Sequence, residues 1–171
     1  MALSRVARGA LVLLALGLLS ACMTSKRPLF DAAAGVAALG EGGTYGSFKR
    51  QDDGSFKRDA TIIVKRRGTL YDFVNEEKAT TPISLHPLRA GEFIGQATSA
   101  KGEFAYVVFR VAGDEILVHV PDCDRQDKAR IAALGARVER LECKLDGVAD
   151  AKAFFETLDL GTAGAKLIAG K

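Results

Sequence analysis

Two histidines, His86 and His119, are the side chains of this 171-residue sequence best suited to acid–base chemistry near neutral pH. A hydrolase or transferase built around either one would also need a nucleophile or a metal ion nearby. The sequence has no Gly-x-Ser-x-Gly elbow, no phosphate-binding glycine loop and no zinc-binding spacing of cysteines or histidines. His119 alternates with apolar residues, so we expect it to face solvent or to accept a hydrogen bond. We predict no catalytic residue and no enzyme, and keep a site near His86 or His119 as the alternative.

Carboxylates offer a second kind of chemistry, because Asp122 and Asp124 have the Asp-x-Asp spacing that can bind calcium. The segment lacks the glycine and the distant glutamate of a hand-type calcium loop. Capping of a helix that starts at Asp124 explains this residue more simply. We predict no metal and no cofactor.

Basic residues gather between positions 46 and 67, where Gly-Ser-Phe-Lys-Arg at 46–50 recurs at 54–58. A three-residue hairpin loop at 52–54 would put residue 48 opposite 58 and residue 50 opposite 56, so that two phenylalanines and two arginines share one face. A two-residue loop would send the phenylalanines to opposite faces. The predicted binding patch is Lys49, Arg50, Phe56, Lys57, Arg58, Arg66 and Arg67. The alternative is a solvated hairpin that keeps a sheet edge from aggregating.

The first 22 residues contain an export pattern: Arg5 and Arg8 precede an apolar run from residue 9 to 19, which ends in Leu19-Ser20-Ala21-Cys22. This segment resembles a bacterial lipoprotein signal sequence, and the resemblance covers about 25 residues. It implies cleavage before Cys22, a diacylglyceryl group on its sulfur and an acylated amino group. Met23 follows the cysteine where an aspartate could stand, and in lipoproteins of enteric type the absence of that aspartate is permissive for transfer to the outer membrane. The alternatives are a plain secretory signal and an uncleaved anchor, although a spanning helix needs about 20 apolar residues and this run is shorter.

Cys123 and Cys143 are the other two cysteines. The compartment that the signal implies oxidises thiols in pairs, so we predict a disulfide between them. Two free thiols, or a redox or metal pair, remain alternatives. The last of these is disfavoured because the two cysteines do not have the Cys-x-x-Cys spacing typical of redox and metal pairs.

Composition limits the remaining 150 residues to one globular domain. The whole sequence has 24 basic and 21 acidic residues, and removal of the signal takes away two arginines and no acid. A protein this close to neutral has no global attraction for nucleic acid, which we exclude as a partner.

The pattern beyond the signal predicts residues 22–43 as a lipidated cysteine with a flexible, Ala/Gly-rich tether and residues 44–171 as the domain. Period-two alternation predicts seven strands, at 44–50, 56–66, 69–75, 82–86, 92–99, 103–112 and 115–121. A helix at 124–134, a strand at 138–145 with a helix as the alternative, a helix at 148–158 and a frayed tail from residue 161 follow. The predicted fold class is α+β: a curved antiparallel sheet or small barrel, with the helices covering one opening.

These features together favour an outer-membrane lipoprotein that faces the periplasm and is attached to the bilayer through acylated Cys22. Its domain is expected to bind an envelope protein or an anionic polymer without catalysis, for example as a modulator of a cell-wall enzyme. A wall hydrolase or transferase, and a structural lipoprotein of an envelope complex, are the alternatives. This functional expectation rests on architecture-level analogy.

Overall fold

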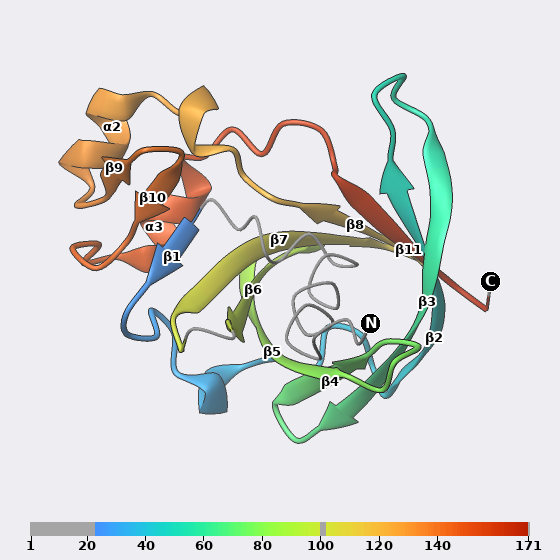
Figure 1. The fold of residues 1–171 in the computed structure, drawn as a ribbon. Helices are drawn as coiled ribbons and strands as arrows, with labels where there is room; N and C mark the ends of the chain where they lie inside the picture. The colour runs from blue at the N-terminus through green and yellow to red at the C-terminus, as the bar shows by residue number, and fades with distance from the viewer. Residues whose placement is uncertain (1–22, 100–101, 171) are drawn as a thin grey trace, which may run out of the picture.

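The computed structural model describes residues 23–99 and 102–170, so Cys22 and the predicted signal peptide lie outside the described residues. Most of the domain is one closed antiparallel barrel of eight strands (Figure 1). The strands are β2 (Gly42–Arg50), β3 (Phe56–Arg67), β4 (Leu70–Val74), β5 (Thr80–Arg89), β6 (Glu92–Thr98), β7 (Phe104–Ala112), β8 (Glu115–His119) and β11 (Ala165–Ala169). Each strand from β2 to β8 pairs with the next, and β11 closes the barrel between β8 and β2.

Alternating side chains fill the barrel interior, which is why the period-two pattern predicted these strands. On β7, Val107 and Phe109 point into the barrel, whereas Tyr106 and Val108 point outward into a second core. β7 is therefore buried on both of its faces. The interior residues are Leu39, Tyr45, Ile62, Val64, Tyr71, Phe73, Ile83, Leu85, Ala97, Val107, Phe109, Ile116, Val118 and Leu167.

The second core lies between the outer surface of β5–β7 and a layer of short elements, on the left in Figure 1. These elements are β1 (Met23–Ser25), β9 (Arg137–Glu139), β10 (Glu142–Lys144), α2 (Lys128–Ala133), α3 (Ala151–Glu156) and the 3₁₀ helix η4 (Cys123–Arg125). A further 3₁₀ helix, η3 (Ala32–Ala34), is exposed and lies outside this core. Phe154 and Phe155 of α3 are fully buried in this core. The helices thus pack against the outside of the barrel wall, and the expectation that they cover an opening is wrong.

The predicted fold class is right for the barrel and only roughly right for the rest, because the described part of the chain is mostly β, with two six-residue α-helices. The expected helix at 124–134 starts later because the Asp127 carboxylate caps α2, while Asp122 caps η4. Asp150 likewise starts α3 three residues after position 148. Among the described residues, no helix is long and apolar enough to cross a membrane.

The region predicted as a single strand at 138–145 is a hairpin of β9 and β10 joined by a two-residue turn at Arg140 and Leu141. Leu141 is therefore exposed at the tip of the hairpin, whereas Cys143 is buried. The expected frayed tail from residue 161 is also wrong, because β11 is hydrogen-bonded on both edges.

Residues 23–43, expected as a tether, pack against the domain instead. β1 lies between β7 and β10, and Met23 is fully buried. Further along, the backbone N–H groups of Leu29 and Phe30 donate to Gln96 Oε1 at 3.0 and 3.1 Å. These hydrogen bonds come from a residue more than 60 positions away, which composition of the segment does not reveal.

Cys123 of η4 and Cys143 of β10 form a disulfide, with their sulfur atoms 2.01 Å apart. Both residues are fully buried in the second core. The disulfide links η4 to β10, the strand beside β1. It therefore holds these short elements together in a region where few backbone hydrogen bonds connect them.

Candidate functional site

The strongest surface feature is the part of the β2–β3 hairpin that extends beyond the barrel, at the upper right of Figure 1. Its loop contains Asp53 and Gly54. Gly54 has a φ of +83°, and the Asp53 carboxylate accepts hydrogen bonds from Ser55 N at 2.9 Å and Ser55 Oγ at 2.6 Å. Phe48 pairs with Arg58, and residue 50 with 56, as the three-residue loop predicted. This register is confirmed.

Both phenylalanines of the hairpin lie half-buried on its outer face. The ammonium group of Lys166, on the neighbouring β11, lies 4.8 Å from the ring centroid of Phe56 and 5.9 Å from that of Phe48. Such contacts hold a cation over an aromatic ring face. The outer face therefore combines two aromatic rings with Arg50, Arg58 and Lys166.

Lys49 and Lys57 lie directly opposite each other on the other face of the hairpin, and both are exposed. Like charges in a cross-strand pair repel each other, so this arrangement costs stability unless an anion is bound. Within the described part of the chain, neither lysine makes an ion pair.

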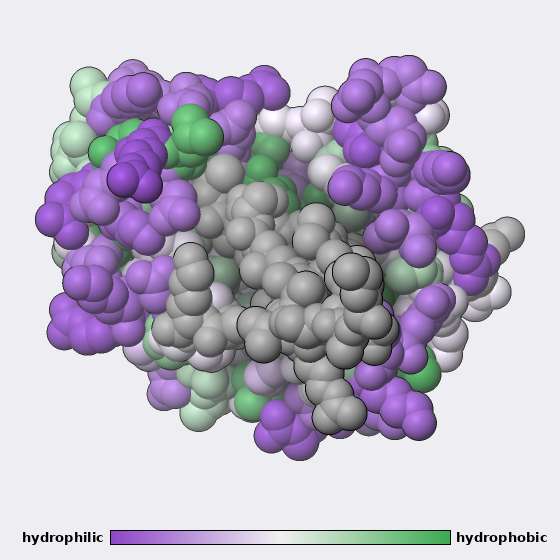
Figure 2. Space-filling model, in the orientation of Figure 1, coloured by the Kyte–Doolittle hydropathy of each residue, from purple (hydrophilic) through white to green (hydrophobic). Residues whose placement is uncertain are grey.

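We call six residues the basic hairpin: Phe48, Lys49, Arg50, Phe56, Lys57 and Arg58. Figure 2 shows hydrophilic residues over this part of the molecule. The loop also carries Asp52 and Asp53, and hydrogen bonds from Ser55 lower the pKa of the Asp53 carboxyl. The acidic tip and the basic stem make the hairpin strongly polar along its length.

Arg66 and Arg67, also assigned to the predicted patch, do not belong to it. They lie at the other end of β3, where Arg66 is nine positions along the strand from Lys57, which corresponds to roughly 30 Å. Arg66 pairs with Glu41 at 3.0 Å, and Arg67 binds both oxygens of Asp72 at 2.9 and 3.1 Å. The grouping was wrong because the two ends of a 12-residue strand lie far apart.

His86 is buried on the outer side of β5. Its Nε2 lies 2.9 Å from Ser84 Oγ, and its ring stacks on Phe30 with centroids 4.6 Å apart. Burial lowers the pKa of His86, and the nearby Asp31 carboxylate opposes the shift. β6 and β7 separate this strand from β8, so the two histidines are not brought together.

His119 at the end of β8 is only 4% exposed. Neither ring nitrogen makes a hydrogen bond of normal geometry with a described residue. The expectation that it faces solvent or accepts a hydrogen bond is therefore wrong, because the 160–161 segment covers the end of β8. Burial and then the positive charge of Arg110 lower its pKa, while the backbone of residues 160–161 and the Glu92 carboxylate act in the other direction.

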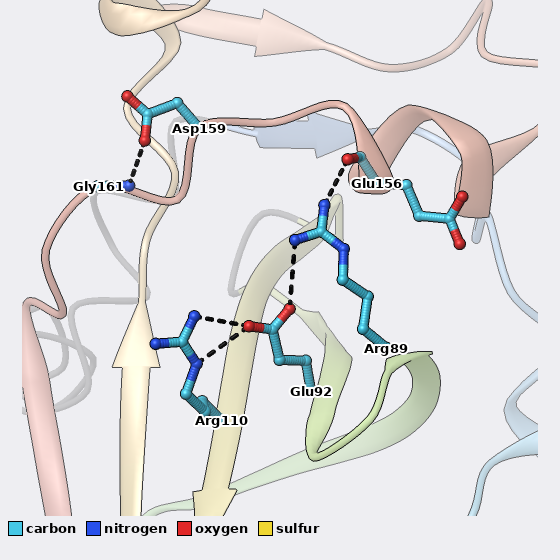
Figure 3. A network of polar contacts seen from close by, with 6 residues as sticks. All are labelled: Arg89, Glu92, Arg110, Glu156, Asp159 and Gly161. Carbon is cyan, nitrogen blue, oxygen red and sulfur yellow. Dashed lines mark hydrogen bonds and ion pairs between the residues drawn. The ribbon is translucent and has the colours of Figure 1, made fainter.

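Beside His119 lies a charged network that the sequence analysis missed (Figure 3). Glu92, with a side chain 8% exposed, accepts from Arg110 Nε at 3.0 Å and Nη2 at 2.6 Å, and its other oxygen lies 3.7 Å from Arg89 Nη1. Arg89 also donates to the carbonyl of Glu156 at the end of α3. The available signal was a pair of opposite charges at facing ends of two predicted strands.

This network favours a structural role over a catalytic one. Glu92 is neutralised by two guanidinium groups, and Arg89 uses its second nitrogen to attach α3 to the barrel. The covered ring of His119 is not accessible to a substrate. Among residues 23–99 and 102–170, no cluster of three metal-binding side chains occurs; Asp124 instead lies 3.7 Å from Lys128.

Comparisons with protein-family models, with curated proteins and with solved structures found no match. The function must therefore be argued from the chemistry of the site.

Proposed function

We propose that this protein is a bacterial outer-membrane lipoprotein, anchored through Cys22 and facing the periplasm, whose barrel binds an anionic polymer of the cell envelope without catalysis. The basic hairpin carries the proposal. Its opposed lysines have no carboxylate partner among the described residues, and its outer face places arginines beside aromatic rings.

The location is supported by the signal sequence and by the disulfide, since paired cysteines are typical of oxidising compartments. In that compartment the available anions are wall polymers, lipid headgroups and acidic proteins. A polymer fits the hairpin best because cations lie on both of its faces along two neighbouring strands, and a chain can contact several of them in succession. The phenylalanine rings supply flat apolar surface against which sugar rings can pack.

The enzyme alternative is disfavoured by burial. A catalytic histidine must reach its substrate, whereas His86 and His119 are 5% and 4% exposed. The structural-lipoprotein alternative needs a partner surface, for which the basic hairpin is again the best candidate. An acidic protein is therefore the second possible partner of the same site.

Charge reversal tests the proposal. We expect Lys49→Glu/Lys57→Glu to reduce cosedimentation with purified peptidoglycan sacculi at low salt about tenfold or more, because two attractive charges become repulsive. Added salt should weaken binding of the unaltered protein in the same assay.

The matched control is Lys65→Glu/Arg66→Glu, which changes net charge equally on the same strand but outside the basic hairpin. Binding should survive in the control. An equal loss of binding in both variants would show that the net charge of the protein, and not the basic hairpin, determines binding to sacculi. Failure of the unaltered protein to bind sacculi would reject the polymer, and crosslinking in intact cells would then test the acidic protein.

A further inference from the structure

The turn between β9 and β10 has two residues that are unusual for its geometry. Arg140 has a φ of +59°, and Leu141 has 67% of its surface exposed. In a two-residue hairpin turn the first position with positive φ normally holds glycine, because other residues are strained there. A polar residue would normally follow it at an exposed tip. Neither residue is thus explained by the needs of the hairpin.

Charge at this turn is also uneven. Arg137 lies 3.8 Å from Glu139, and Lys144 lies 2.6 Å from Glu142, so these cations are paired with carboxylates. Arg140 makes no ion pair with any residue that the structure describes. The tip therefore presents one unneutralised cation beside one large exposed apolar side chain.

The position of the turn links it to the proposed anchor. β1 and β10 are parallel, with Met23 beside Cys143. Parallel strands start at the same end, so the chain before Met23 leaves the domain at the end of β10 where the β9–β10 turn lies. Consecutive Cα atoms are about 3.8 Å apart, so a group attached at position 22 is held within one residue of β1.

We propose that the β9–β10 turn is a second membrane contact, in which Leu141 enters the bilayer interface and Arg140 binds lipid phosphate. The inference rests on the proposed anchoring through Cys22. Because β1 is packed from Met23 onward, no flexible spacer separates the anchor from the domain, and this face must lie against the bilayer. An apolar side chain beside a cation is the combination that interfacial segments use, and a second contact strengthens lipid anchoring.

The basic hairpin lies on the opposite side of the barrel from β9 and β10 in Figure 1. An anchor at this turn would therefore leave the hairpin free to reach a polymer away from the membrane. The two proposed sites then have different ligands: bilayer lipid at the turn and wall polymer at the hairpin.

Hydroxyl-radical footprinting of the full lipidated protein tests this inference without altering the turn. Proteoliposomes of phosphatidylethanolamine and phosphatidylglycerol would be compared with the Cys22→Ser protein in solution. Oxidation of Leu141 should fall several-fold in the proteoliposomes. Ile63, the other exposed large hydrophobic residue among those described, lies on β3 and should be oxidised equally in both samples.

Two failures are distinguishable in that experiment. A protein that does not float with the vesicles overturns the lipid anchor and this inference with it. A protein that floats but leaves Leu141 as reactive as in solution overturns the second contact alone. As an independent measurement, Leu141→Asn in the Cys22→Ser background should bind the same vesicles about tenfold more weakly than its parent, because a buried leucine side chain is lost. Equal binding would also overturn the contact.

Discussion

Gln96 on β6 fastens the 29–30 segment to the barrel, and its removal gives the sharpest test of how that segment is held. The side chain is 5% exposed. Its Oε1 accepts from the backbone N–H groups of Leu29 and Phe30, and its Nε2 donates to the Phe30 carbonyl at 3.0 Å. Gln96→Leu keeps the approximate volume of the side chain and removes all three hydrogen bonds.

The cost follows from which backbone groups lose a partner. The N–H of Leu29 still reaches the Tyr106 hydroxyl at 3.1 Å, whereas the N–H and carbonyl of Phe30 lose the bonds that Gln96 supplied. Two unpaired buried groups cost roughly 2–5 kcal/mol if the segment stays in place. The segment can instead detach into water, so we expect local opening to become easier by at least about 2 kcal/mol, or roughly thirtyfold.

Native-state hydrogen exchange measures this opening directly. Amides of residues 29–36 should exchange at least thirtyfold faster in Gln96→Leu, while those of β2 and β3 should change far less. Gln126→Leu is a matched control, because Gln126 makes three similar hydrogen bonds to the backbone of Asp122 and Asp159. It should accelerate exchange near residue 159 and leave 29–36 unchanged. Unaltered exchange at 29–36 in Gln96→Leu would refute the reasoning.

Two further predictions concern stability. Burial lowers the pKa values of His86 and His119, so below about pH 6.5 the unfolded chain binds more protons than the folded protein. The free energy of unfolding should therefore fall as the pH drops from about 6.5, by at most about 1.4 kcal/mol per pH unit for each histidine. Denaturant unfolding between pH 7.5 and 5 should show this slope, and an unchanged slope in His119→Gln would contradict the contribution of that residue. Gly95→Ala should lower stability by about 1–3 kcal/mol, because the new methyl group would overlap the Phe109 ring inside the barrel, and a melting temperature equal to that of the unaltered protein would contradict the packing.

The barrel strands were predictable because each repeats apolar and polar residues with a period of two and ends at a turn. β11 was missed for a physical reason: Ala165–Ala169 is short and contains two alanines, so its strand conformation depends on the free edges of β2 and β8. Local pattern carries no information about such edges.

In the candidate site, too, the features set by local sequence were predictable and those that depend on distant strands were not. The loop chemistry at residues 52–54 was enough to predict the hairpin register and the shared face of Phe48 and Phe56. The contact of Lys166 with both rings could not be predicted, because Lys166 lies on β11, which the sequence pattern did not indicate as a strand. Glu92 pairs across neighbouring strands with Arg110 and Arg89, whereas the bond from Arg89 to the Glu156 carbonyl depends on how α3 packs and had no signal in the local pattern.

Closure by β11 has a consequence for the order of assembly. In a growing chain that stops before residue 165, β2 is paired only with β3 and β8 only with β7, so the sheet remains open with two unpaired edges. Open edges recruit strands from neighbouring molecules, and charged side chains delay that recruitment. Lys49, which faces Ala165 across the seam, would keep unfinished copies apart until their own final strand arrives.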